Sequence, residues 1–147
     1  AALLNDCTKK LDMDRQLSLC RHYGIDLDPL EQANLKLLHS KTGAAVARDK
    51  FGVSEEIYNA IYYHTTGKAD MTLLEKIIYL ADYIEPSRRF PGVEELRRAV
   101  HTDLNEGLYR ALLDSVKELQ GYGSPVHPHT REALDYIRSE IGGTIHE

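Results

Sequence analysis

The chain has 147 residues, of which 42% are hydrophobic and 28% charged, and its formal net charge is −5. This composition is typical of one ordinary globular domain with a hydrophobic core, and the negative charge argues against general binding to nucleic acid polymers. The two cysteines, Cys7 and Cys20, have no CxxC spacing, which argues against a disulfide framework and favours a reducing, cytoplasmic location. Cys7 is interpreted as a small buried hydrophobic residue. No apolar run reaches the length of a bilayer span, so no membrane partner is expected.

The elements follow from apolar spacing and from helix start and stop signals. Leu3 and Leu4 are assigned to a helix that ends near residues 5–9. Pro29 is expected to open a short helix. Longer helices are predicted at 14–23, 37–51, 55–64, 73–84, 93–100, 104–119 and 129–141. No segment alternates with a period of two residues, so the expected fold class is all-α.

Three helix ends carry specific signals. Gly24 is expected to stop the helix before it. Ser54 is a predicted N-cap, because its hydroxyl can accept a hydrogen bond from a free N–H of the first turn. Thr72 and Glu75 have the spacing of a capping box. These signals place the starts of the helices at 55 and 73.

Four potential metal ligands, Asp6, His39, His64 and Asp82, lie within or at the ends of apolar helical stretches. Buried carboxylates and imidazoles are destabilising unless they are paired, and one cation between helices would pair all four. A histidine taken alone is more often a core or capping residue than a ligand. For Asp82, a helix cap or an ion pair with an arginine such as Arg48 is an equally open interpretation.

The basic pairs Lys9–Lys10 and Arg88–Arg89 each follow closely after a candidate ligand. Such charges usually form a solvated face. At these two positions, however, they lie where a phosphate chain near a metal would need neutralising. The pairs therefore favour an anionic substrate.

Five segments resemble the HD-domain metal phosphohydrolases, and in particular the bacterial YqeK-like symmetrical bis-nucleosyl tetraphosphatases. That branch cleaves diadenosine tetraphosphate to two ADP. The string TLLEKIIYLADYIEPSRRFPGV is the most specific, and the resemblance covers essentially the whole chain. The resemblance implies an HD-domain helical bundle with a metal site between helices. It also implies a single domain over 1–147 that lacks the family's N-terminal helix. The segments are AALLNDCTKKLD, LLHSKTGAAVA, AIYYHTTG, MTLLEKIIYLADYIEPSRRFPGV and HTDLNEGLYRALLDSV.

The resemblance also implies roles for the metal-binding residues. Asp6 would bridge two metal ions and take part in catalysis. His39 and His64 would complete the shell of the second ion, and Asp82 would bind the first. Asn5 stands where the family has a histidine ligand of the first ion, and an amide oxygen is a poorer donor than imidazole for such metals.

Further roles concern the substrate. By the same resemblance, Lys9 would act in catalysis and in substrate binding. Arg88 and Arg89 would face the polyphosphate with it. The residues expected to shape the substrate cleft are Thr65, Thr66 and Gly67.

The implied cofactor is a divalent or trivalent first-row metal, a pair of ions in the family. Two histidines and one carboxylate suit iron better than magnesium, and manganese or cobalt could substitute. With Asn5, and with no counterpart of a further upstream histidine, we expect a damaged first ion site.

The expected function is therefore metal-dependent hydrolysis of diadenosine tetraphosphate to two ADP, by attack of an activated water on phosphorus, at an impaired rate. The expected partner is this small molecule, without nucleic acid or membrane, and a homodimer through an exposed first helix is left open. One alternative is a degenerate nucleotide-binding sensor or adaptor domain. Another is a helical interaction module whose polar residues are merely hydrogen-bonded.

Overall fold

The structure, a computed structural model, describes residues 1–145 of the chain and the side chains of residues 1–142. Every secondary-structure element within this part is a helix, which confirms the all-α expectation. None of these helices is both long and apolar enough to cross a bilayer. The helices are α1 (Met13–Tyr23), α2 (Pro29–Gln32), α3 (Leu35–Phe51), α4 (Glu55–Tyr62), α5 (Leu73–Tyr83), α6 (Val93–Thr102), α7 (Leu104–Gly121) and α8 (Pro128–Ile145).

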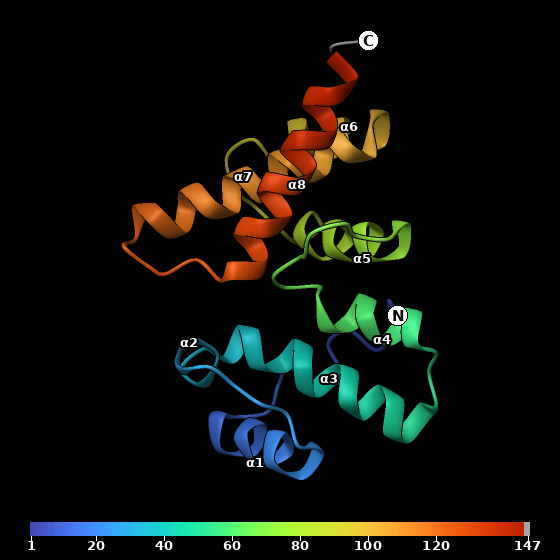
Figure 1. Cartoon of the computed structure of the whole chain (residues 1–147), viewed down its shortest axis with the longest axis vertical. Coiled ribbons are helices and arrows are strands. Elements are labelled where there is room, and N and C mark those ends of the chain that lie inside the picture. The colour runs from blue at the N-terminus through green and yellow to red at the C-terminus, as the bar shows by residue number, and fades with distance from the viewer. Residues whose placement is uncertain (146–147) are drawn as a thin grey trace. The chain divides into compact units, whose positions relative to one another are not determined.

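The chain forms two compact units, one over Ala1–Thr66 and one that begins at Gly67. The first contains α1 to α4 and the second contains α5 to α8 (Figure 1). The assignment of residues 1–147 to a single domain stays a prediction. Each unit has its own hydrophobic cluster and is described by itself.

The predicted helix ends are confirmed by their hydrogen bonds. Ser54 accepts from the N–H of Ile57 at 3.3 Å. Thr72 accepts from the N–H of Glu75 at 3.2 Å, and the Glu75 carboxylate accepts from the N–H of Thr72 at 2.8 Å. Gly24 ends α1 with a φ of 65°, a conformation that strains any residue with a Cβ. Local side-chain chemistry therefore sets these helix boundaries.

The prediction of a helix at the N-terminus is wrong, because residues 2–10 form a series of turns. The N–H groups of Cys7, Lys9 and Leu11 each bond the carbonyl three residues earlier. The side chain of Thr8 bonds to α3 instead of lying along a helix of its own, so tertiary contacts outweigh helix propensity here. Cys7 is exposed, which corrects its interpretation as a buried residue.

Helix α4 ends at Tyr62, so His64 lies in the turn after the helix and not within it as predicted. The ring Nδ1 of His64 is 2.6 Å from the carbonyl oxygen of Ile61. The last carbonyls of a helix lack partners within the helix, and this side chain satisfies one of them. The local turn thereby sets the orientation of the imidazole.

In the first unit, α3 contacts α1, α2 and α4 (Figure 1). Its buried positions are rich in small residues such as Ala44 and Ala47, which let neighbouring segments approach closely. Gly43 shows this best, because a Cβ placed there would lie 3.4 Å from the carbonyl oxygen of Asn5. The N-terminal turns are thus held directly against the backbone of α3.

In the second unit, α7 contacts α5, α6 and α8 around a core that includes Leu80, Leu108, Leu112 and Ile137. Helices α6 and α7 approach most closely at Gly107. A Cβ built at this position would lie 2.6 Å from Cγ2 and 2.8 Å from Cα of Val100. These distances are too short for carbon atoms, so the helix crossing requires glycine.

We expect Gly107→Ala to lower the free energy of unfolding by about 2–3 kcal/mol, because the added methyl group forces the backbones of α6 and α7 apart. Gly121→Ala is the matched control on the same helix, where a Cβ meets nothing within 4 Å. The control should stay within about 1 kcal/mol of wild type. Urea denaturation measures both, and equal stability of the two variants would contradict the close crossing.

Candidate metal centre

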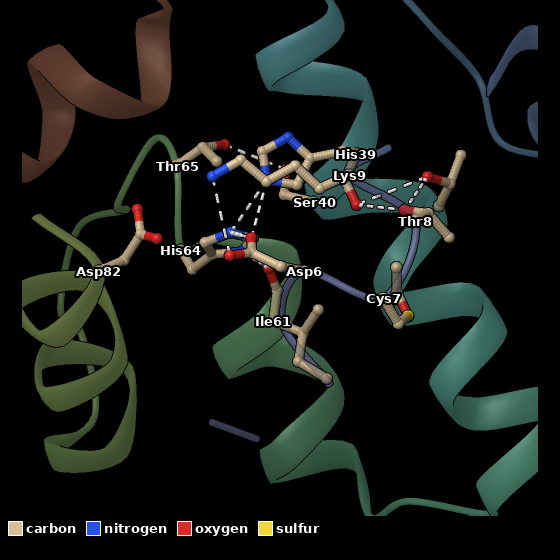
Figure 2. Close-up of polar contacts among 12 residues, drawn as sticks. Asp6, Cys7, Thr8, Lys9, His39, Ser40, Ile61, His64, Thr65 and Asp82 are labelled. Carbon is tan, nitrogen blue, oxygen red and sulfur yellow. Dashed lines mark hydrogen bonds and ion pairs between the residues drawn. The ribbon is translucent and has the colours of Figure 1, made fainter. Parts of the chain in front are cut away.

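Three of the predicted ligands converge from three segments of the first unit. Asp6 comes from the N-terminal turns, His39 from α3 and His64 from the turn after α4 (Figure 2). The two Nε2 atoms are 3.2 Å apart, and they lie 3.4 and 3.5 Å from Oδ1 of Asp6. The predicted meeting of these three side chains is therefore present in the structure.

Both imidazoles direct Nε2 to this point. The carbonyl of Ile61 can only accept, so Nδ1 of His64 donates to it and Nε2 is the nitrogen that faces the centre. Burial, and next the neighbouring His64, lower the pKa of His39, although Asp6 acts in the opposite direction. Two imidazole nitrogens, both capable of binding a metal ion, thus lie beside a carboxylate oxygen.

This donor set fits a first-row metal ion. A point equidistant from the three atoms lies about 1.9 Å from each, by the three measured separations, and bonds of such metals to nitrogen and oxygen are about 2.0–2.2 Å. Three acceptors this close repel one another unless a cation or proton lies between them. Two imidazoles and one carboxylate are also the donors that first-row metals prefer.

Exposure at the centre is uneven. The side chain of His64 is fully buried, whereas that of Asp6 is 40% exposed and that of Lys9 is 53% exposed. The ammonium group of Lys9 is 3.8 Å from Oδ2 of Asp6 (Figure 2). Lys9 is therefore a solvent-exposed positive charge next to the carboxylate of Asp6.

A hydroxyl pair holds the His64 turn on α3. The hydroxyls of Ser40 and Thr65 are 3.0 Å apart, and each residue directly follows one of the two histidines (Figure 2). Ser40 also donates to the carbonyl of Leu37 at 3.0 Å. The pair thus joins the two segments that carry His39 and His64.

Two of the other predicted residues, Thr66 and Gly67, lie at the end of the first unit and at the start of the second. Thr66 is buried. Gly67 has a φ of 72°, and a Cβ there would lie 3.2 Å from Cβ of Ala133, so the position needs glycine for structural reasons. The metal role of Asn5 and the cleft roles of Thr66 and Gly67 stay predictions.

Asp82 lies near the end of α5 in the second unit, and its meeting with the three converging ligands stays a prediction. One oxygen of Asp82 is 3.5 Å from Nη2 of Arg88. The open interpretation of an arginine partner is therefore confirmed for Arg88. Arg48, the partner considered from the sequence, pairs with Glu55 at 3.0 Å.

The loop that carries the basic pair is organised by Arg97, which the sequence analysis missed. Its guanidinium donates to the carbonyls of Ile84, Glu85 and Arg88 at 3.0, 2.9 and 3.2 Å. Glu94 pairs with the same group. The end of α5 leaves carbonyl groups without helical partners, and these groups need a donor. That need was the only sign in the sequence of the contacts that Arg97 makes. Arg89 remains exposed in this loop and bonds to the carbonyl of Pro86.

The chain is similar to several known proteins. The family model of the HD domain matches residues 1–87. The symmetrical bis(5′-nucleosyl)-tetraphosphatase of Halalkalibacterium halodurans is 40% identical over 141 residues, which cover 95% of this chain and 75% of the relative. The protein of the same name from Bacillus subtilis is 47% identical over 107 residues, covering 72% of this chain and 58% of the relative.

A solved structure is also similar. It is a predicted HD superfamily hydrolase involved in NAD metabolism from Clostridium acetobutylicum, with a TM-score of 0.88 and 42% identity. The match covers 94% of this chain and 74% of that one. The likeness therefore extends over both compact units.

We expect Arg97→Met to lower the free energy of unfolding by about 2 kcal/mol, because three carbonyls and Glu94 lose a charged donor. Arg98→Met is the control on the exposed side of the same helix, and it should change stability by less than about 0.5 kcal/mol. Urea denaturation gives the free energies, and hydrogen exchange at residues 84–90 should be faster only in Arg97→Met. Unchanged exchange there would contradict the role of Arg97.

Proposed function

Because the chain belongs to the HD-domain family and, within it, to the symmetrical bis(5′-nucleosyl)-tetraphosphatases, we propose that it hydrolyses diadenosine tetraphosphate to two ADP. The observation that carries the proposal is the convergence of Asp6, His39 and His64. A metal-dependent reaction on phosphorus needs this kind of donor set, and the relatives named above carry the matching activity in their names.

The residues of the first unit have different roles in the proposed reaction. Asp6, His39 and His64 would hold a cation, which supplies charge neutralisation and an acidified water for attack on phosphorus. The contact of His64 with Ile61 holds its ring with Nε2 facing the centre. Lys9 would steady the negative charge of the substrate from the exposed side. We propose iron as the cation on the strength of the two-histidine, one-carboxylate set, with manganese or cobalt as substitutes.

The residues proposed for substrate binding differ in their present partners. Thr65 lies beside His64 and is held by Ser40, so its hydroxyl has a defined position near the centre. Arg89 is exposed, whereas Arg88 is shared between Asp82 and Glu85. An incoming polyphosphate would compete with these carboxylates for Arg88. Thr66 and Gly67 are proposed only as parts of the backbone turn that follows Thr65.

The first ion of the proposed site is the weaker one. Its ligands here would be Asp6 and Asp82, with the neutral amide of Asn5 at the position of a family histidine. A neutral amide oxygen binds a first-row cation less well than imidazole does. We therefore propose that the chain is a slow enzyme relative to a homologue with histidine at position 5.

Asn5 also favours the second candidate function, a domain that binds the dinucleotide as a sensor without cleaving it. Calorimetry with diadenosine tetraphosphate, run beside an assay for ADP, separates the two functions. Tight binding without ADP release would support the sensor. Release of ADP as the sole nucleotide product supports the hydrolase.

Two further proposals concern the setting of the chain. We propose a reducing, cytoplasmic location, supported by the free thiols of Cys7 and Cys20. A homodimer through the N-terminal segment is supported by Leu3, whose side chain is 96% exposed. The proposed partner of the site itself is a dinucleoside polyphosphate.

We expect His39→Ala to abolish metal binding and ADP formation together, because one of three donors is lost. His22→Ala is the matched control, since His22 is an exposed histidine on α1. Elemental analysis after iron reconstitution measures the metal, and chromatography of the products measures ADP. A wild-type chain without metal, or a His39→Ala chain with wild-type metal content, would refute the site.

Asn5→His should increase ADP formation several-fold, because an imidazole replaces the neutral amide at the weaker ion position. The variant should also bind a second equivalent of cation per chain in a titration with Mn²⁺. Asn34→His, at the N-cap of α3, adds a histidine elsewhere and serves as the control. A variant that shows neither effect would remove Asn5 from the proposed site.

A further inference from the structure

Gln16 is a fully buried polar residue on α1, and it joins two segments of the metal centre. Its side-chain amide donates to the carbonyl of Thr8 at 2.7 Å, and its amide oxygen accepts from the hydroxyl of Thr42 at 2.6 Å. The hydroxyls of Thr8 and Thr42 are 2.8 Å apart. These bonds form a closed ring that runs through Thr8, whose main-chain carbonyl accepts from Gln16 and whose hydroxyl bonds to Thr42.

The direction of the bonds follows from the amide. The oxygen of Gln16 can only accept, so the hydroxyl of Thr42 must donate to it. The single hydroxyl proton of Thr8 is then shared between the hydroxyl oxygen of Thr42 at 2.8 Å and the carbonyl oxygen of His39 at 3.0 Å. Bonds in such a buried cycle polarise one another, and the loss of one member leaves buried groups without partners.

The ring lies directly behind the ligands. Thr8 follows Asp6 by two residues in the N-terminal turns, and Thr42 follows His39 by one helical turn of α3 (Figure 2 shows Thr8 bonded to α3). The N-terminal turns have no helix of their own to hold them. Besides the packing of Ala1 and Leu4, these bonds tie the turns to α3 next to the 3.4 Å contact between Asp6 and His39.

We propose that Gln16 is a positioning residue of the metal centre. It contacts neither the cation nor the substrate, and it acts through Thr8 and Thr42 on the separation of Asp6 from His39. The inference rests on the proposed function, because it assumes that these side chains bind a metal. Partners that orient metal ligands typically contribute a factor of about 10–100 in metal affinity.

The test is a titration of the whole chain with Co²⁺, followed by visible absorption, together with urea unfolding of the metal-free protein. Gln16→Met keeps the length of the side chain and removes both hydrogen bonds. We expect it to weaken Co²⁺ binding roughly 10–100-fold and to alter the absorption bands, which report coordination geometry. Binding as tight as in the wild type would overturn the proposal.

Cys20→Ala is the matched control. Cys20 is also buried, one turn further along α1, and its side chain makes no hydrogen bond within the described residues. We expect this variant to lose stability while its Co²⁺ affinity stays at the wild-type value. If Cys20→Ala and Gln16→Met lose the same stability and also weaken Co²⁺ binding to the same extent, the role of Gln16 is merely structural. That result would overturn the proposal.

If Gln16→Met does not fold, a second pair of variants tests the same proposal. Thr42→Val removes the hydroxyl at nearly constant shape, and Thr42→Ser restores it. We expect weak Co²⁺ binding in the first and near-wild-type binding in the second, and equal affinities would overturn the ring as the cause. If the wild-type chain binds no Co²⁺, the proposed function itself is refuted. If the wild type binds Co²⁺ and the variants bind it equally well, only the role of Gln16 is refuted.

Discussion

The metal centre depends on one electrostatic constraint, the burial of two imidazole Nε2 atoms 3.2 Å apart beside a carboxylate oxygen. Without a positive charge between them, these three acceptors destabilise the first unit, so the fold has to hold them together against their repulsion. Much of the first unit serves this purpose. The Ile61 carbonyl fixes the ring of His64, the Ser40–Thr65 pair fixes its turn, and the ring that includes Gln16 fixes the turn that carries Asp6.

The features that could be predicted from the sequence are those with a local signal. Thr72 and Glu75 lie three residues apart and cap α5 as expected, and the apolar spacing located every long helix. His39 and Asp6 were recognised because polar residues in apolar stretches need partners. The N-terminal turns, Gln16 and Arg97 were missed because their bonding partners lie on other elements or past a helix end, and no spacing within one segment reveals such pairs.

The two kinds of match cover different lengths of the chain. The general HD-domain match ends at residue 87, and it includes Asp6, His39, His64 and Asp82. The tetraphosphatase of Halalkalibacterium halodurans instead aligns over 95% of the chain, so the likeness continues through most of the second unit. Arg88, Arg89 and Arg97 all lie in this additional part. The residues proposed as metal ligands thus lie within the general match, whereas these three arginines lie outside it.

The three converging donors all belong to the first 66 residues, whereas Arg88 and Arg89 belong to the second unit. Any ion that prefers the folded first unit stabilises it by mass action, by about 1.4 kcal/mol for each tenfold rise in free ion concentration above its dissociation constant. The resistance of this half of the chain to local opening, and to proteases that require such opening, would then follow the supply of transition metal in the cell.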